Sequence, residues 1–111
     1  FLQHPDRFLL NLRVSKCGGL LQASEMAAAC KDAGMGVIVG AQVGETSVLT
    51  RAALSIAEMM GKHLVTQEGA YGTYLLSEDM TRSTLMFGRQ GVLHPHDLGL
   101  KAGFGLQPKQ V

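Results

Sequence analysis

The chain has 111 residues, of which 46% are hydrophobic and 17% charged, and its formal net charge at pH 7 is +1. This length suits one small domain, and the balance of apolar and charged residues is that of a folded globular protein. The ten basic residues are scattered and the net charge is close to zero. The sequence therefore excludes a basic surface of the kind that binds nucleic acid.

The cysteines and the hydropathy of the sequence indicate in which cellular compartment the protein is expected. Cys17 and Cys30 form neither a Cys-x-x-Cys pair nor a metal-binding framework, so we expect a reducing cytoplasm. No apolar run approaches the ~20 residues that cross a bilayer, and there is no signal-peptide pattern, so we expect no membrane partner. The chain begins at Phe1, without an initiator methionine, within an expected helix end. This start suggests a piece of a longer protein.

The first strand is predicted after a connector over residues 1–10. Residues 11–19, NLRVSKCGG, begin as an alternating run with two apolar side chains on one face and Arg13 and Ser15 on the other. This pattern predicts a strand that delivers Lys16 at its carboxyl end. Sheets of α/β proteins carry their chemistry at that end of their strands.

A helix and a buried strand are predicted next. Residues 20–33 have helical periodicity, and Gly34 is the expected terminator. The apolar stripe of this helix comprises Leu20, Ala23, Met26, Ala27 and Cys30. Residues 35–40 form an unbroken apolar run between glycines, which is typical of a strand buried on both faces of a parallel sheet.

The second strand is followed by a turn over residues 41–45 and a second helix. Thr46 or Ser47 is the predicted N-cap of that helix, and Gly61 is its predicted end. The apolar stripe is Leu49, Ala52, Ala53, Ile56, Ala57 and Met60. Residues 63–67 are predicted to form a third strand.

The last third of the chain has weaker periodicity. We predict a loop that can hold a short turn of helix over residues 73–82 and a glycine-rich tail over residues 99–111. A small hairpin is expected over residues 85–93, around the turn from Gly88 to Gly91.

Alternating strands and helices with short connections predict an α/β fold with a parallel sheet. Two architectures fit this order. One is a small doubly wound sheet, and the other is part of a (β/α)₈ barrel, which needs ~250 residues when complete. The glycines after Lys16 match neither the dinucleotide-binding motif nor the phosphate-binding loop, so a nucleotide site is not expected.

The motifs resemble a known family. Residues 11–19, the helix after them and residues 40–47, GAQVGETS, look like the sixth and seventh βα units of the mandelate racemase and muconate lactonizing branch of the enolase superfamily. Residues 63–68 are similar to the eighth strand of that family, and residues 75–106 to its closing segment. The resemblance implies that residues 1–111 are a C-terminal fragment of a (β/α)₈ barrel, namely its last three βα units and tail.

The family abstracts a proton α to a carboxylate, and Mg²⁺ stabilises the resulting enediolate. Lys16 matches the lysine of the sixth strand, so the resemblance implies that Lys16 is a catalytic acid or base acting on a small carboxylate substrate. A lysine suits this role because desolvation and a nearby dication both favour the neutral amine. The parent enzyme is then a racemase or epimerase, a cycloisomerase or a dehydratase.

Further site residues follow from the resemblance. Glu45 matches an acidic residue after the seventh strand and is a candidate catalytic partner of the substrate, although a carboxylate in a first helical turn is also favoured by the helix dipole. Gly18 and Gly19 let the backbone turn behind the lysine and approach the substrate. Gln42 and Glu68 are candidate substrate-binding residues. The chain has Gln-Glu where some members carry Asp-x-Asp, so dipeptide specificity is not implied.

The family takes its three Mg²⁺ ligands from the third, fourth and fifth strands, so we expect no metal ligands on this chain and no activity from it alone. The cluster at residues 94–97, His-Pro-His-Asp, is interpreted as an exposed loop. A partial barrel exposes strand edges, so we expect self-association or pairing with a complementary barrel part. The alternative is a small non-catalytic α/β domain, or an associating half-barrel with no catalytic role.

Overall fold

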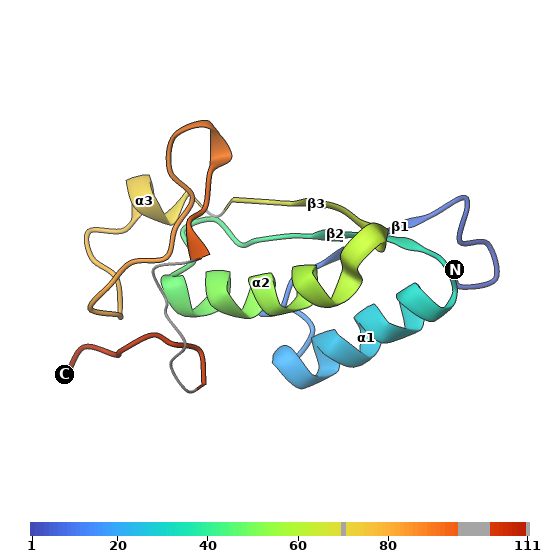
Figure 1. The fold of residues 1–111 in the computed structure, drawn as a ribbon, viewed down its shortest axis with the longest axis horizontal. Coiled ribbons are helices and arrows are strands. Elements are labelled where there is room, and N and C mark those ends of the chain that lie inside the picture. The colour runs from blue at the N-terminus through green and yellow to red at the C-terminus, as the bar shows by residue number, and fades with distance from the viewer. Residues whose placement is uncertain (70, 96–102, 111) are drawn as a thin grey trace.

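A parallel three-stranded sheet with two long helices forms the centre of the chain (Figure 1). A computed structural model describes residues 1–69, 71–95 and 103–110. The strands lie in the order β1-β2-β3, and both neighbouring pairs are parallel. The predicted α/β order and parallel sheet are therefore confirmed. The elements are β1 (Leu9–Leu12), α1 (Leu20–Asp32), β2 (Gly36–Val39), α2 (Ser47–Met60) and β3 (Leu64–Gln67), with a 3₁₀ turn, η1 (Gly61–His63), before β3.

The first strand differs from the prediction at both ends. It begins at Leu9, within the expected connector, and ends at Leu12. The last rung of its ladder runs from the Gly40 amide to the Leu12 carbonyl, at 2.8 Å. The Arg13 carbonyl then accepts the Lys16 amide at 2.9 Å. Because this bond closes a turn, Lys16 lies beyond the strand and not at its end.

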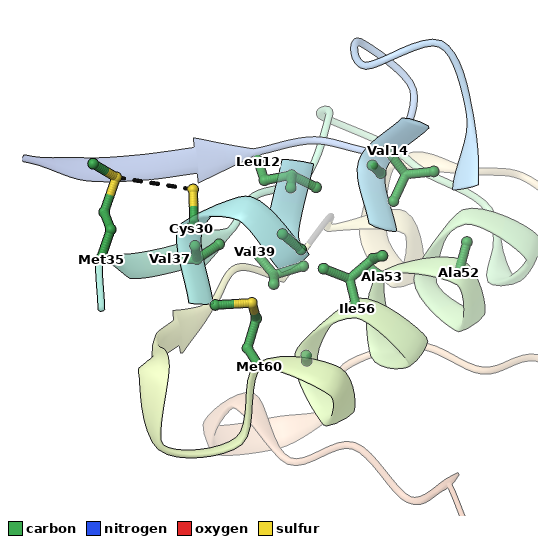
Figure 2. Close-up of a cluster of buried hydrophobic side chains, with 13 residues drawn as sticks. Leu12, Val14, Cys30, Met35, Val37, Val39, Ala52, Ala53, Ile56 and Met60 are labelled. Atoms are coloured by element: carbon green, nitrogen blue, oxygen red, sulfur yellow. Dashed lines mark hydrogen bonds between the residues drawn. The ribbon is translucent and has the colours of Figure 1, made fainter. Parts of the chain in front are cut away.

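Both long helices lie on the same face of the sheet, and the core fills the space between the helices and the sheet (Figures 1 and 2). The predicted bounds of both helices hold to within one residue, and Gly34, at φ +74°, follows the end of α1. Met26 is 41% exposed, so its predicted place in the apolar stripe is wrong. The core comprises Leu12, Val14, Ala23, Ala27, Cys30, Met35, Val37, Val39, Ala52, Ala53, Ile56, Ala57 and Met60.

The opposite face of the sheet is left open by the described residues. Val37 and Val39 are fully buried against the helices, whereas Ile38, which alternates with them, is only half-buried. On the open face Leu9 is 57% exposed and Val65 is 53% exposed. The expectation that the second strand is buried on both faces is therefore wrong for the described residues, because α1 and α2 cover one side only.

The segment after β3 gathers beside the carboxyl ends of the strands (Figure 1). It contains one short helix, α3 (Gly72–Leu75), where a short turn was expected, and a 3₁₀ turn, η2 (Arg89–Gly91). The predicted hairpin is wrong, because residues 85–93 form no strand. The Gly88 amide instead donates to the Val92 carbonyl at 2.8 Å and closes a loop.

Residues 103–110 contact both the loop after α3 and helix α2. Thr81 pairs with Pro108 in an isolated antiparallel bridge, and the Arg51 Nε donates to the Phe104 carbonyl at 3.2 Å. Of the expected loop at residues 94–97, residues 96 and 97 lie outside the described part of the chain, as do residues 99–102 and 111 of the expected tail. No helix in the described ranges is both long and apolar enough to cross a bilayer.

Candidate functional site

The three strand ends bring the predicted site residues to one edge of the sheet. Residues 13–19 follow β1, residues 40–46 follow β2, and Glu68 follows β3. In a parallel sheet all carboxyl ends meet at the same edge, which is where α/β proteins bind ligands. All six predicted site residues lie in these three segments.

Glu68 links all three strand ends through its backbone and side chain. Its amide donates to the Val39 carbonyl at 2.8 Å and extends the β2–β3 ladder by one residue. Its Oε1 accepts the Asn11 Nδ2 and its Oε2 accepts the Ala41 amide, both at 3.1 Å. Hydrogen bonds to a charged carboxylate are stronger than those between neutral groups, so Glu68 holds β1 and the loop after β2 in register.

Glu45 is buried, with 7% of its surface exposed. Its Oε1 accepts the Gln42 amide at 2.8 Å and the Ser15 hydroxyl at 3.5 Å. The short contact closes the turn before α2, and the longer one ties that turn to the loop after β1. The carboxylate thus has a local structural role, and its predicted contact with substrate stays a prediction.

Lys16 is exposed in the turn over residues 14–18. Among the described residues its ammonium group has neither a hydrogen bond nor an ion pair. Gly18 and Gly19 follow with φ of +84° and +105°, a region that favours glycine. These angles fit the tight turn expected behind the lysine, while contact of the two glycines with substrate stays a prediction.

An open cavity of about 460 Å³ lies at this edge of the sheet. Its lining includes two predicted substrate-binding residues, Gln42 and Glu68, but not Lys16. Arg13, Gly69 and Tyr71 also line it. The structure therefore brings Gln42 and Glu68 together in one cavity and leaves Lys16 outside it.

Sequence reasoning missed several residues of this edge. Asn11, Arg13 and Ser15 share it with the predicted residues, and alternation along the first strand was the one available signal for them. Tyr71 has φ +53°, an uncommon left-handed conformation for a residue with a side chain. Nothing in the local sequence indicates that Tyr71 takes this conformation.

The described residues do not fit a metal centre. No three histidine, cysteine, aspartate or glutamate side chains come together within them. The carboxylates of Glu45 and Glu68 are also engaged separately, each in its own set of hydrogen bonds. That the Mg²⁺ ligands lie on other strands of the parent protein stays a prediction.

Comparisons with models of known protein families, with curated proteins and with solved structures found no match to this chain.

Proposed function

We propose that this chain supplies the last three βα units and the closing segment of an enolase-superfamily barrel. Its parent enzyme abstracts a proton α to the carboxylate of a small organic acid. The observation that carries the proposal is the sheet itself, whose strands follow chain order with both helices on one face. In a (β/α)₈ barrel, helices cover the outside and the other face of the sheet points inward.

The open face and the free edges support a barrel over a doubly wound sheet. A doubly wound sheet carries helices on both faces, whereas α1 and α2 of this chain share one face (Figure 1). A purely parallel sheet with one bare face is unusual for a complete fold. Within the described residues β1 and β3 each have one unpaired edge, where further strands of a barrel continue the sheet.

The proposed role of Lys16 is to move one proton. Its neutral amine takes the α proton of the substrate, and the electron pair of the broken C–H bond stays on the substrate as an enediolate. The ammonium form then returns a proton to carbon or exchanges it with solvent. Such a general base contributes about 10²–10⁴-fold to a rate. By resemblance, Mg²⁺ belongs to the parent enzyme, and the described residues of this chain do not fit a metal site.

The other candidate residues are assigned supporting roles. Glu45 holds the turn after β2 and is a hydrogen-bonding or electrostatic partner of the substrate, and Gln42 and Glu68 bind substrate in the cavity that they line. Gly18 and Gly19 permit the close approach of the backbone. Both cysteines are free thiols, which supports the proposed cytoplasmic compartment.

The test uses the longer protein that carries this chain. We expect Lys16→Ala to abolish exchange of the α proton of 2-hydroxy and 2-amino acids with D₂O, followed by proton NMR. Mg²⁺ binding, measured by calorimetry, should stay within about twofold of the wild type because no ligand is removed. The matched control is Lys62→Ala, which removes another exposed lysine, in η1 at the far edge of the sheet. Exchange that persists in Lys16→Ala at the wild-type rate would exclude Lys16 as the acid or base.

An associating half-barrel without catalytic role is the second candidate. The open sheet face and the two free edges favour it for this chain alone, since unpaired parallel strands are templates for other strands. It predicts association of the isolated chain and no α-proton exchange by the longer protein, with or without Lys16.

A further inference from the structure

Arg13 crosses the open face of the sheet directly after β1. Its neighbour Leu12 is fully buried against the helices, so alternation along the chain turns Arg13 to the opposite face. A Cβ on Gly40 would lie 3.0 Å from the Arg13 Cγ. The aliphatic part of Arg13 therefore lies against the Gly40 backbone, where glycine leaves room for it.

The guanidinium group has no protein acceptor in the described part of the chain. Arg13 is half-buried and lines the cavity of about 460 Å³, yet no hydrogen bond or ion pair of its side chain is formed there. Glu68, the acidic residue of the same cavity, already uses both oxygens on Asn11 and Ala41. Arg13 thus brings a positive charge and five N–H donors, without a protein acceptor among the described residues, to the lining of an open cavity.

We propose that Arg13 anchors a carboxylate group of a small organic anion in this cavity. The planar guanidinium fork matches a carboxylate with two parallel hydrogen bonds. The negative charge of Glu68 on the same lining opposes a phosphate dianion more strongly than a single carboxylate. The volume falls within the range of about 300–1,000 Å³ for small-molecule sites. The inference rests on the proposed function in one respect, because it takes this carboxylate to be part of the substrate.

Gln42 and Tyr71 complete the recognition of the anion. Gln42 lines the cavity and carries a side-chain amide donor, while its backbone amide is already bound by Glu45 at 2.8 Å. Tyr71, at φ +53°, belongs to the same lining and is mostly exposed, so its aromatic ring and hydroxyl are available to a ligand. These groups contact the part of the anion beyond its carboxylate and so contribute to specificity.

Succinate binding to the 111-residue chain tests the proposal. Titration followed by ¹H–¹⁵N NMR should shift the side-chain Nε–H signal of Arg13 and the backbone amides of Gln42 and Gly69. Arg13→Gln removes the charge and leaves a shorter polar side chain, and it should weaken succinate binding by about tenfold or more, as expected for a charge-assisted hydrogen-bonded pair. Arg13→Lys keeps the charge without the fork and should bind with intermediate affinity. Wild-type binding should weaken with added salt.

The controls separate a specific site from general attraction. Arg7→Gln removes an exposed arginine before β1 and should leave succinate binding unchanged. Succinamide, the neutral analogue, should not shift the Arg13 signal. Equal binding of succinate by Arg13→Gln and by the wild type would refute the proposal. The absence of a shift at Arg13 in the wild type would also refute it, and this measurement does not depend on the folding of any variant. Tighter binding of inorganic phosphate than of succinate would refute the choice of a carboxylate.

The outcome is separable from that of the proposed function. Succinate binding needs neither Mg²⁺ nor the other strands of a barrel, whereas the Lys16 experiment measures proton exchange in the longer protein. If the longer protein exchanges the α proton but the chain does not bind succinate, only the proposed role of Arg13 is refuted. Arg13-dependent binding without any exchange would remove the proposed reaction and leave a carboxylate-binding site.

Discussion

Single residues at the carboxyl edge of the sheet act through the environment that the fold gives them. Arg13 and Lys16 are both basic and three positions apart, yet Arg13 is half-buried in a cavity while Lys16 is exposed in a turn. The two cysteines also differ in burial. Cys17 is half-buried in the turn after β1, and Cys30 is buried in the last turn of α1 with its Sγ 3.9 Å from the Met35 Sδ. Residue type alone therefore does not set reactivity here.

Burial raises the pKa of the Cys30 thiol above its ordinary value by desolvating the thiolate. We expect iodoacetamide at pH 8 to modify Cys17 in the folded chain and Cys30 only after unfolding in urea, with mass spectrometry as the measurement. Because the folded pKa is the higher one, the contribution of Cys30 to stability is full below its ordinary pKa and is lost as pH rises through the folded value. The Cys17→Ser variant is the control, and rapid modification of its remaining cysteine without urea would contradict the prediction.

At the scale of elements, the start of α2 depends on a residue far along the chain. The prediction that Thr46 or Ser47 is the N-cap of α2 is confirmed for Thr46, but the Thr46 side chain makes no capping hydrogen bond. Asp79 accepts the Ser47 amide at 3.0 Å and also the Ser47 hydroxyl. The Ser47 Oγ in turn accepts the Leu85 amide at 2.6 Å. This buried network fastens the segment after α3 to the helix start.

Loss of the Asp79 carboxylate should destabilise this junction. We expect Asp79→Ala to lower the free energy of unfolding by about 2 kcal/mol, because the amide and hydroxyl of Ser47 then lose a buried acceptor at a helix start. Urea unfolding followed by circular dichroism, at one fixed chain concentration, measures the change.

The matched control for this experiment is the neighbouring acid, Glu78. It pairs with Lys109 at 3.1 Å in an exposed ion pair, and such pairs contribute little. Glu78→Ala should therefore change the free energy of unfolding by at most about 0.5 kcal/mol. Equal effects of the two substitutions would show that the buried network does not stabilise α2.

At the scale of the whole molecule, the described chain has one covered and one bare side. The helices bury one face of the sheet, while Leu9 and Val65 stay more than half exposed on the other. Within the part of the chain that the structure describes, each outer strand has a free edge, and free edges in a parallel sheet favour pairing with another strand. These features give the chain a surface for a second copy or for a complementary part of a barrel.

We therefore expect the chain to associate on its own. Its mass, measured by light scattering after size-exclusion chromatography, should rise with chain concentration, and its melting temperature should not respond to Mg²⁺. Val65→Lys should reduce association by placing a charge on the open face. Leu21→Lys, at an exposed position of α1, is the control and should leave association unchanged. A monomer with one sharp transition at all concentrations would contradict the partial barrel.

The order and type of the main elements could be predicted from the sequence. Helical periodicity predicted α1 and α2, and the apolar run between glycines predicted β2, because side-chain spacing along the chain reports local backbone geometry. It also indicated that the candidate site lies where the strands end. The predicted ranges were less accurate for β1, whose end depends on where its partner β2 stops offering backbone hydrogen bonds.

Which side chains meet depends on contacts between residues that lie far apart along the chain. Glu68 reaches Asn11 across 57 positions, and Asp79 reaches Ser47 across 32, so no local pattern could indicate either contact. The bare face of β2 likewise depends on both helices lying on one side of the sheet. Periodicity indicates which apolar residues share one face of a helix or strand. The alignment of strands and the packing of helices decide which of these faces are covered and which charged residues line the same cavity.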